Sequence, residues 1–128
     1  MADAATTLTL SRLPKTWLID VDGVCLAHNG HLRADERLLP GVREFWAGLG
    51  ADDMVILLSA REESWRAPTL ALFADLGLRV DQALFGLPVG ERILINDKKP
   101  GGLLTAHAVN LARDAGLESV RIDLDPTL

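Results

Sequence analysis

The sequence lacks the cysteines that a disulfide framework would need and the basic excess that a nucleic-acid surface would need. Cys25 is its single cysteine, which excludes an internal disulfide and is typical of a reducing compartment. Lys and Arg total 13 against 18 Asp and Glu, so the formal net charge is -5. A chain of this charge has no basic footprint for DNA or RNA, and we expect no nucleic-acid partner.

Long apolar runs are also missing. No segment reaches the length of a membrane span, and the first residues lack the charged region and apolar core of a signal peptide. We therefore expect no membrane partner and a cytoplasmic location. At 128 residues the chain has room for one ordinary domain. Residues 1–14 are expected to be a loosely ordered leader and residues 15–128 a single domain.

Short apolar runs of strand type are present, and most of them alternate with stretches of helical spacing. The expected strands cover residues 16–20, 53–59, 79–86, 92–97 and 119–124, and the expected helices cover 41–50, 61–77 and 102–116. Residues 25–41 are polar and irregular, with a turn signal at Asn29 and Gly30. Alternation of this kind predicts an α/β fold, with a mostly parallel sheet between helices on both faces.

Polar side chains stand at the ends of three of these runs. Asp20 and Asp22 follow the first, Ser59 ends the second, and Asn96 with Asp97 ends the run over 92–97. Ligands of open α/β sheets bind outside the carboxyl ends of the strands, so these side chains are expected to converge on one edge. Two or three carboxylates there suit Mg²⁺ completed by a substrate phosphate. One carboxylate can attack phosphorus while a second moves protons.

Three motifs in this order resemble the haloacid dehalogenase (HAD) superfamily of phosphatases. They are LIDVDGV at residues 18–24, VILLS at 55–59 and ILINDKKP at 93–100, and the resemblance runs from about Trp17 to Gly116. It implies a three-layer α/β/α Rossmann-like fold and a Mg²⁺-dependent phosphomonoesterase. In that reading Asp20 is the nucleophile and Asp22 the general acid/base.

The resemblance also implies the remaining site residues. Asp20, the backbone carbonyl of Asp22 and Asp97 would hold Mg²⁺, and Ser59 would bind the phosphoryl oxygens. The expected substrate-binding set is Gly23, Ser59, Ala60, Arg61 and Lys98. Cys25 is not expected to be the nucleophile, because the carboxylates before it would raise the pKa of its thiol.

The chain departs from the family pattern at two places. The family usually has a Lys upstream of the last motif, yet no Lys occurs between Lys15 and Lys98. We expect Lys99 to supply the missing cation in preference to Lys98, with Arg92 as a competitor. Asn96 stands where many members carry an acid or a glycine, which would weaken metal binding.

Neither gap between the motifs is long enough for a cap domain, so the chain looks like a small capless member. Capless relatives leave the site open or borrow a neighbouring subunit as a lid. We therefore expect a homo-oligomer, a tetramer in preference to a dimer, with residues 25–32 at the interface. The substrate expected by analogy is a sugar phosphate of polysaccharide biosynthesis. Two alternatives stay open: an aspartate-based phosphotransferase, and a non-catalytic HAD-like module that binds a phosphorylated ligand or a partner.

Overall fold

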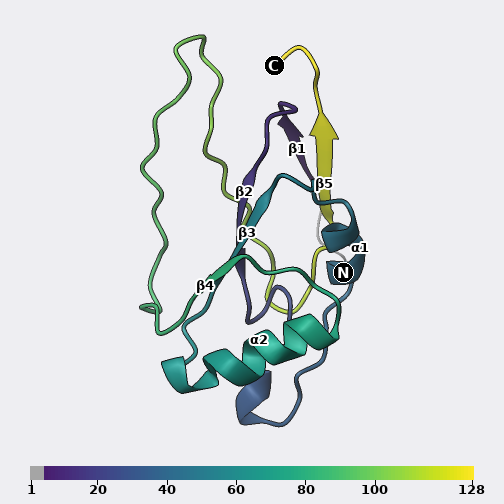
Figure 1. Cartoon of the computed structure of the whole chain (residues 1–128), viewed down its shortest axis with the longest axis vertical. Coiled ribbons are helices and arrows are strands. Elements are labelled where there is room, and N and C mark those ends of the chain that lie inside the picture. The colour runs from purple at the N-terminus through teal and green to yellow at the C-terminus, as the bar shows by residue number, and fades with distance from the viewer. Residues whose placement is uncertain (1–4) are drawn as a thin grey trace.

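The computed structural model describes residues 5–128, and Figure 1 shows their path. The elements in chain order are β1 (Thr6–Leu10), β2 (Thr16–Asp20), the 3-10 turn η1 (Gly30–Leu32), α1 (Val42–Ala47), β3 (Met54–Leu58), η2 (Glu63–Trp65), α2 (Arg66–Asp75), β4 (Gln82–Leu84) and β5 (Val120–Leu124). The strands form two small sheets, and the larger one contains the strands that end at Asp20 and just before Ser59.

The larger sheet has the strand order β2-β3-β4, and both strand pairs are parallel. Asp20 is opposite Leu58, so the ends of β2 and β3 are level, and Leu58 is opposite Leu84. The strand prediction for residues 16–20 is therefore confirmed with the same bounds, and those for 53–59 and 79–86 are confirmed with shorter bounds. Parallel strands bring their carboxyl ends to one edge, and the chain continues from that edge into the loops that carry Asp22 and Arg61.

Both α-helices pack on one face of this sheet. Ile19, Val55 and Leu57 point into a buried cluster that also contains Trp46 of α1 and Phe73 of α2. The Trp46 and Phe73 rings lie 6.1 Å apart between centroids, so the two helices share one core. Helices were expected near residues 41–50 and 61–77, and α1 and α2 confirm both, although α2 begins only at Arg66, just before Pro68.

The opposite face of the sheet is partly open. Leu18 of β2 and Leu84 of β4 point to it and are 47% and 51% exposed. The helix expected over residues 102–116 would belong to a layer on this face, but it does not form. A helix draws most of its stability from packing an amphipathic face, and this stretch stays largely outside the core. In the described residues the sheet therefore has a helical layer on one side only.

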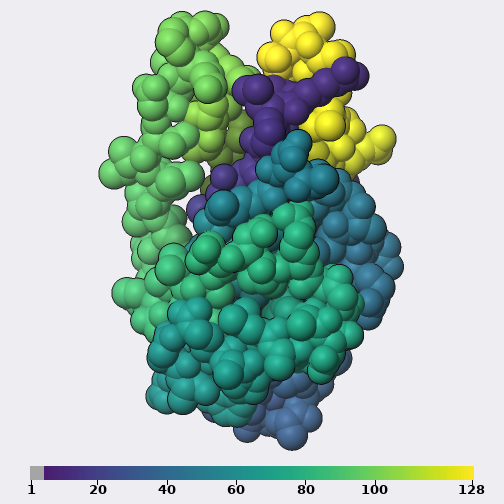
Figure 2. Space-filling view, viewed as in Figure 1, coloured from purple at the N-terminus to yellow at the C-terminus, as the bar shows by residue number. Residues whose placement is uncertain are grey.

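Residues 90–113, which we call the arm, leave the body and return to it. Figure 1 shows the two legs of the arm rising beside the sheets, and Figure 2 shows its green portion standing off the rest of the molecule. Its tip is a turn in which Gly102 N–H donates to the Lys99 carbonyl at 2.8 Å. The strand expected over 92–97 is wrong for this structure: the run has no neighbouring strand, and Ile95 is 92% exposed.

The smaller sheet pairs β1 with β5 in parallel, from Thr6 opposite Val120 to Leu10 opposite Leu124. The expected leader over residues 1–14 is thus wrong for Thr6–Leu10, whose alternating Thr and Leu side chains suit a strand. Residues 1–4 lie outside the described part of the chain. The strand expected near 119–124 does form, but it pairs with β1 and not with the larger sheet.

The described chain is an α/β fold with parallel strands, consistent with a Rossmann-like arrangement. Among residues 5–128 no helix has both the length and the apolar character to cross a membrane.

Candidate active site

A tight turn follows β2 and carries the two aspartates of the DVDG motif. Val21 N–H donates to the Leu58 carbonyl at 3.0 Å, so β2 stays attached to β3 for one residue beyond Asp20. The chain then folds back, because Cys25 N–H and Leu26 N–H both donate to the Val21 carbonyl at 3.0 Å. Gly23 has a φ of +81°, a conformation that glycine adopts without strain. The turn thus holds Asp20 and Asp22 at the carboxyl end of the sheet.

A cavity of about 440 Å³ opens over this turn. Its walls come from the β2 turn, the loop around η1, the β3–α2 loop and the start of the arm. The lining residues are Asp20, Asp22, His28, Asn29, His31, Leu32, Ala60, Arg61, Glu62, Trp65, Val89 and Arg92. The predicted site residues Asp20, Asp22, Ala60 and Arg61 are therefore brought together.

Arg92 is the cation on Asp20. Its Nη1 lies 3.0 Å from Asp20 Oδ1, and the side chains are 36% and 38% exposed. Arg92 stands at the beginning of the arm, so the arm enters the body beside the nucleophile candidate. Sequence reasoning left Arg92 as a competitor for the cationic position, and the structure places it there.

Arg61 is the cation on Asp22, and its side chain is fully buried. Its Nε donates to Asp22 Oδ2 at 3.1 Å, and its Nη2 donates to Asp22 Oδ1 at 3.0 Å. On the far side of the guanidinium, Nη2 donates to Glu36 Oε1 at 2.7 Å and Nη1 donates to Glu36 Oε2 at 3.0 Å. Nη1 also donates to Thr69 Oγ1 at 3.0 Å.

The charges around Arg61 are therefore balanced inside the protein. Burial by itself lowers the pKa of Arg61, but the hydrogen bonds and negative charges of Glu36 and Asp22 raise it above its ordinary value. Arg61 was expected to bind substrate. Every nitrogen of its guanidinium already donates to Asp22, Glu36 or Thr69, so Arg61 holds Asp22 in place before any ligand arrives.

Ser59 lies beneath the cavity rather than in its wall. It is fully buried, and its Oγ accepts a hydrogen bond from Arg61 N–H at 3.0 Å. The Ser59 N–H donates to the Leu84 carbonyl at 2.9 Å, which fixes the loop to β4. Ser59 thus shapes the loop that carries Arg61 and is not among the cavity-lining residues.

Aromatic and imidazole rings form the wall that faces the aspartates. The His31 and Trp65 rings meet edge to face with centroids 4.7 Å apart. Burial, and then the positive charge of Arg61, lower the pKa of His31, so its imidazole is neutral at pH 7. His28 N–H donates to Asp114 Oδ1 at 2.8 Å, which ties this wall to the end of the arm.

Cys25 is buried directly behind the aspartates. Burial, and then the charges of Asp20 and Asp22, raise the pKa of its thiol far above the ordinary value. A thiol in that state is protonated and therefore a poor nucleophile at neutral pH. The expectation that Cys25 is not the nucleophile is consistent with this environment.

Several predicted site residues do not line the cavity. Asp97, Lys98 and Lys99 lie on the arm, and Gly23 is part of the β2 turn but lies against Arg113. The predicted positions of Asp97 and Lys99 assumed a strand over residues 92–97 in the sheet. Because the run leaves the body instead, Asp97 rises with the arm, where its carbonyl accepts a hydrogen bond from the Thr105 hydroxyl.

Glu36 and Thr69 were not anticipated as part of the site. Glu36 lies in the polar stretch after η1, where an acid gives no distinguishing signal. Thr69 is the fourth residue of α2 and is fully buried. A hydroxyl among apolar helix positions is the one sequence feature that could have indicated a buried polar partner.

The predicted magnesium set of Asp20, the Asp22 backbone carbonyl and Asp97 is not assembled, because Asp97 lies on the arm and not in the cavity wall. Among residues 5–128 no group of three or more His, Cys, Asp or Glu side chains is placed to hold a metal ion. Asp20 and Asp22 do lie together in the cavity wall. Mg²⁺ is often bound by one or two carboxylates, with waters and substrate phosphate as its other ligands. The Asp22 carboxylate is already bound by Arg61, so Asp20 is the carboxylate of the cavity wall that fits a magnesium ion completed by a substrate phosphate.

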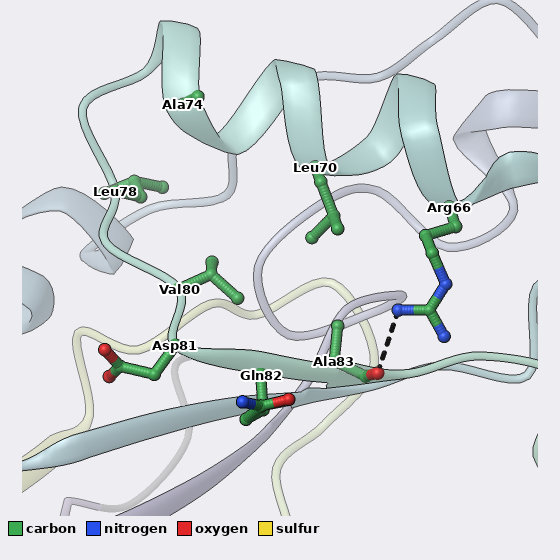
Figure 3. Close-up of a pocket in the computed structure, with 8 residues that line it drawn as sticks. All are labelled: Arg66, Leu70, Ala74, Leu78, Val80, Asp81, Gln82 and Ala83. Carbon is green, nitrogen blue, oxygen red and sulfur yellow. Dashed lines mark hydrogen bonds between the residues drawn. The ribbon is translucent and has the colours of Figure 1, made fainter.

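A second hollow of about 290 Å³ lies between α2 and β4 (Figure 3). Leu70, Leu78 and Val80 point into it, and Arg66 donates to the Ala83 carbonyl at 3.0 Å. Its one acid, Asp81, already accepts hydrogen bonds from Val55 N–H and from Arg79. This hollow has no paired carboxylates, so the cavity over the β2 turn is the candidate active site.

Comparisons with protein-family models, with curated proteins and with solved structures find no match to this chain.

Proposed function

We propose that this protein is a Mg²⁺-dependent phosphomonoesterase of the HAD type that works through an aspartyl-phosphate. One observation carries the proposal: Asp20 and Asp22 line the same cavity, and each carboxylate is held by a different arginine. Two carboxylates with separate environments can take separate roles, one as a nucleophile and the other as an acid and base.

Asp20 is the nucleophile in this proposal because its carboxylate is the more exposed of the two. Arg92 pairs with it before substrate binds, and the guanidinium can also bind a phosphate through parallel N–H donors. A phosphomonoester entering the cavity would share Arg92 with Asp20. Arg92 thereby supplies the cation that the sequence lacks upstream of its last motif.

The reaction has two displacements. In the first, an Asp20 oxygen forms a bond to phosphorus, the bond from phosphorus to the leaving oxygen breaks, and Asp22 gives that oxygen a proton. In the second, water attacks the phosphorus, Asp22 takes a proton from the water, and the Asp20 carboxylate and inorganic phosphate are released. Mg²⁺ held by the Asp20 carboxylate and the Asp22 carbonyl would supply charge stabilisation at the phosphoryl oxygens.

The finer parts of the assignment belong to the same proposal. They are a HAD-like three-layer identity of the fold, the absence of a cap, a sugar phosphate as substrate and a homo-oligomeric state. The open cavity, with Trp65, His28 and Asn29 in its walls, has room for a leaving group that carries hydroxyls.

Phosphate release over a panel of sugar phosphates, nucleotides and phospholipid head groups, with and without Mg²⁺, tests the proposal. We expect metal-dependent release with at least one ester, and a phosphoryl mass increment on Asp20 after acid quench. Asp20→Asn is the control, and it should abolish both signals. Transfer to an added alcohol in place of water would identify a phosphotransferase instead.

A non-catalytic phosphate-binding module is the second candidate. It is favoured by the position of Asp97 and Lys99 on the arm, away from the cavity wall. Calorimetry that detects ester binding, in a preparation that binds Mg²⁺ and releases no phosphate from any member of the panel, would establish this candidate and overturn the first.

A further inference from the structure

A buried arginine stands between two carboxylates, only one of which belongs to the DVDG motif. Arg61 has no exposed side-chain surface, whereas Asp22 and Glu36 are partly open at 14% and 29%. Asp22 occupies the Nε and Nη2 edge of the guanidinium, and Glu36 occupies the Nη1 and Nη2 edge. The plane and the position of Arg61 are thus fixed from both sides.

Thr69 completes the fixation from α2. Its hydroxyl accepts from Nη1 at 3.0 Å, in a bond that is buried at both ends. An arginine side chain has several rotatable bonds and loses much rotamer freedom when it is held. Glu36 and Thr69 supply the contacts that offset this cost, so that Arg61 presents a fixed pair of donors to Asp22.

We infer that Glu36 and Thr69 are positioning residues that set the orientation of the Asp22 carboxylate through Arg61. The inference rests on the proposed function, in which Asp22 moves protons to and from the reacting oxygens. Thr69 is not a cavity-lining residue, and Glu36 is not one either, so their effect on the reaction passes through Arg61. Displacement of a catalytic group by about 1 Å can cost about a hundredfold in rate.

Conservative substitutions separate positioning from folding. Glu36→Gln keeps the shape but offers Arg61 a single acceptor oxygen, with an NH₂ group against the other nitrogen. Thr69→Val keeps the shape and removes the hydroxyl, and Thr69→Ser restores it. Glu63→Gln is the matched control, because it removes the charge of the Glu63–Arg66 pair, an ion pair between η2 and the first residue of α2 that does not touch Asp22.

The first readout is steady-state turnover of the folded variants. We expect Glu36→Gln and Thr69→Val to lower kcat about 10- to 100-fold with KM within about twofold, because the interaction acts on the reacting state. Thr69→Ser and Glu63→Gln should keep the wild-type kcat. Adding Glu36→Gln to Asp22→Asn should change kcat by less than about twofold, since the group it positions is already disabled. Wild-type turnover by Glu36→Gln, or losses that multiply in the double variant, would overturn the inference and leave the proposed function standing.

The second readout does not depend on activity. The Arg61 Nε–H can be followed by NMR, with its signal identified by its loss in Arg61→Lys. We expect the hydrogen exchange of this group to be at least about tenfold faster in Glu36→Gln and Thr69→Val than in wild type, and unchanged in Glu63→Gln. A wild-type protein without turnover refutes the proposed function. Arg61 exchange that Glu36→Gln leaves unaltered refutes the positioning inference, whatever the turnover.

Discussion

The two arginines at the candidate site differ in how many hydrogen-bond donors of their guanidinium groups remain free for a ligand. Arg61 is buried and donates from all of its guanidinium nitrogens, whereas Arg92 is partly exposed and is joined to Asp20 alone by an ion pair among the described residues. A bound phosphate can therefore recruit Arg92 without stripping a buried charge of its partners, which is costly for Arg61. Burial therefore separates Arg61, whose donors are all used inside the protein, from Arg92, which has donors left for an anion.

Asp20→Asn should abolish turnover and preserve the fold. The amide has the volume of the carboxylate but is no nucleophile, and Asp20 is not part of the buried core. Asp22→Asn should lose roughly 10²–10⁴-fold, the range for general acid/base help. Single-turnover kinetics with circular dichroism as a folding control compare the two. Near-normal turnover by Asp20→Asn contradicts the mechanism.

Arg92→Ala should lower activity more than Lys99→Ala, which reverses the order expected from the sequence. Arg92 lies 3.0 Å from Asp20, and Lys99 is at the turn of the arm. The loss should be larger in KM than in kcat if Arg92 binds the substrate phosphate before the reaction as well as during it. Arg92→Lys, which keeps the charge but not the paired donors, is the matched variant. A greater loss in Lys99→Ala would mean that the arm closes over the site.

Asp53 connects the amino ends of two elements of the larger sheet. Its carboxylate accepts from Lys15 N–H and Trp17 Nε1–H, both at 2.9 Å, at the start of β2, and from Gly50 N–H at 3.0 Å in the turn before β3. Burial raises the pKa of Asp53, but the hydrogen bonds from Trp17, Lys15 and Gly50 together lower it below the ordinary value. The ionised carboxylate is therefore a stabilising link between β2 and β3.

Asp53→Asn should lower the free energy of unfolding at neutral pH and weaken its dependence on acid. A carboxyl group with a lowered folded-state pKa stabilises the fold fully above its unfolded value of 3.8, and this contribution is lost as the pH falls below that value. Urea unfolding of wild type and variant at pH 7 and at pH 3 measures the difference. We expect the gap between the two proteins to narrow at pH 3. A gap that stays constant would assign no stabilising role to the charge.

Elements with a sequence signal and a neighbour to pack on were predictable, and those without a neighbour were not. β2, β3, α1 and α2 have apolar patterns whose buried faces meet in one cluster. Residues 92–97 have an equally apolar pattern, but a strand also needs an adjacent strand for its hydrogen bonds, and pattern alone does not supply one. The same limit applies to β1, whose partner is more than a hundred residues away in the chain.

The site residues that could be predicted are those whose strands form. Asp20, Asp22 and Arg61 line one cavity because they end or follow β2 and β3, whereas Asp97 is not in the cavity wall because the strand expected before it does not form. Glu36 and Thr69 were missed since their importance depends on Arg61, whose burial is a property of the folded chain. Ser59 occupies the predicted loop but faces inward.

At the scale of the whole molecule, exposed apolar side chains occur on the arm and on the face of the larger sheet that has no helical layer. Ile93 and Ile95 on the arm are 78% and 92% exposed, and Leu18 and Leu84 lie on the open face of the sheet. Within residues 25–32, which were expected at an interface, Cys25, Leu26 and Ala27 are buried, whereas Leu32 is 67% exposed. The arm is the segment that stands off the rest of the molecule (Figure 2).

We expect a second copy of this chain to cover the arm. Exposed apolar side chains gathered on one projecting segment are typical of an interaction surface, and closed homo-oligomers are the commonest assemblies of soluble proteins. Light scattering coupled to gel filtration should give a multiple of the 13.8 kDa chain mass. Ile93→Ser with Ile95→Ser should shift the protein to monomer, because it removes two exposed apolar side chains of the arm, whereas Lys99→Ser on the same arm should not. A wild-type protein that elutes only as monomer at working concentration, with full activity, would contradict this prediction, because no second copy would then cover the arm.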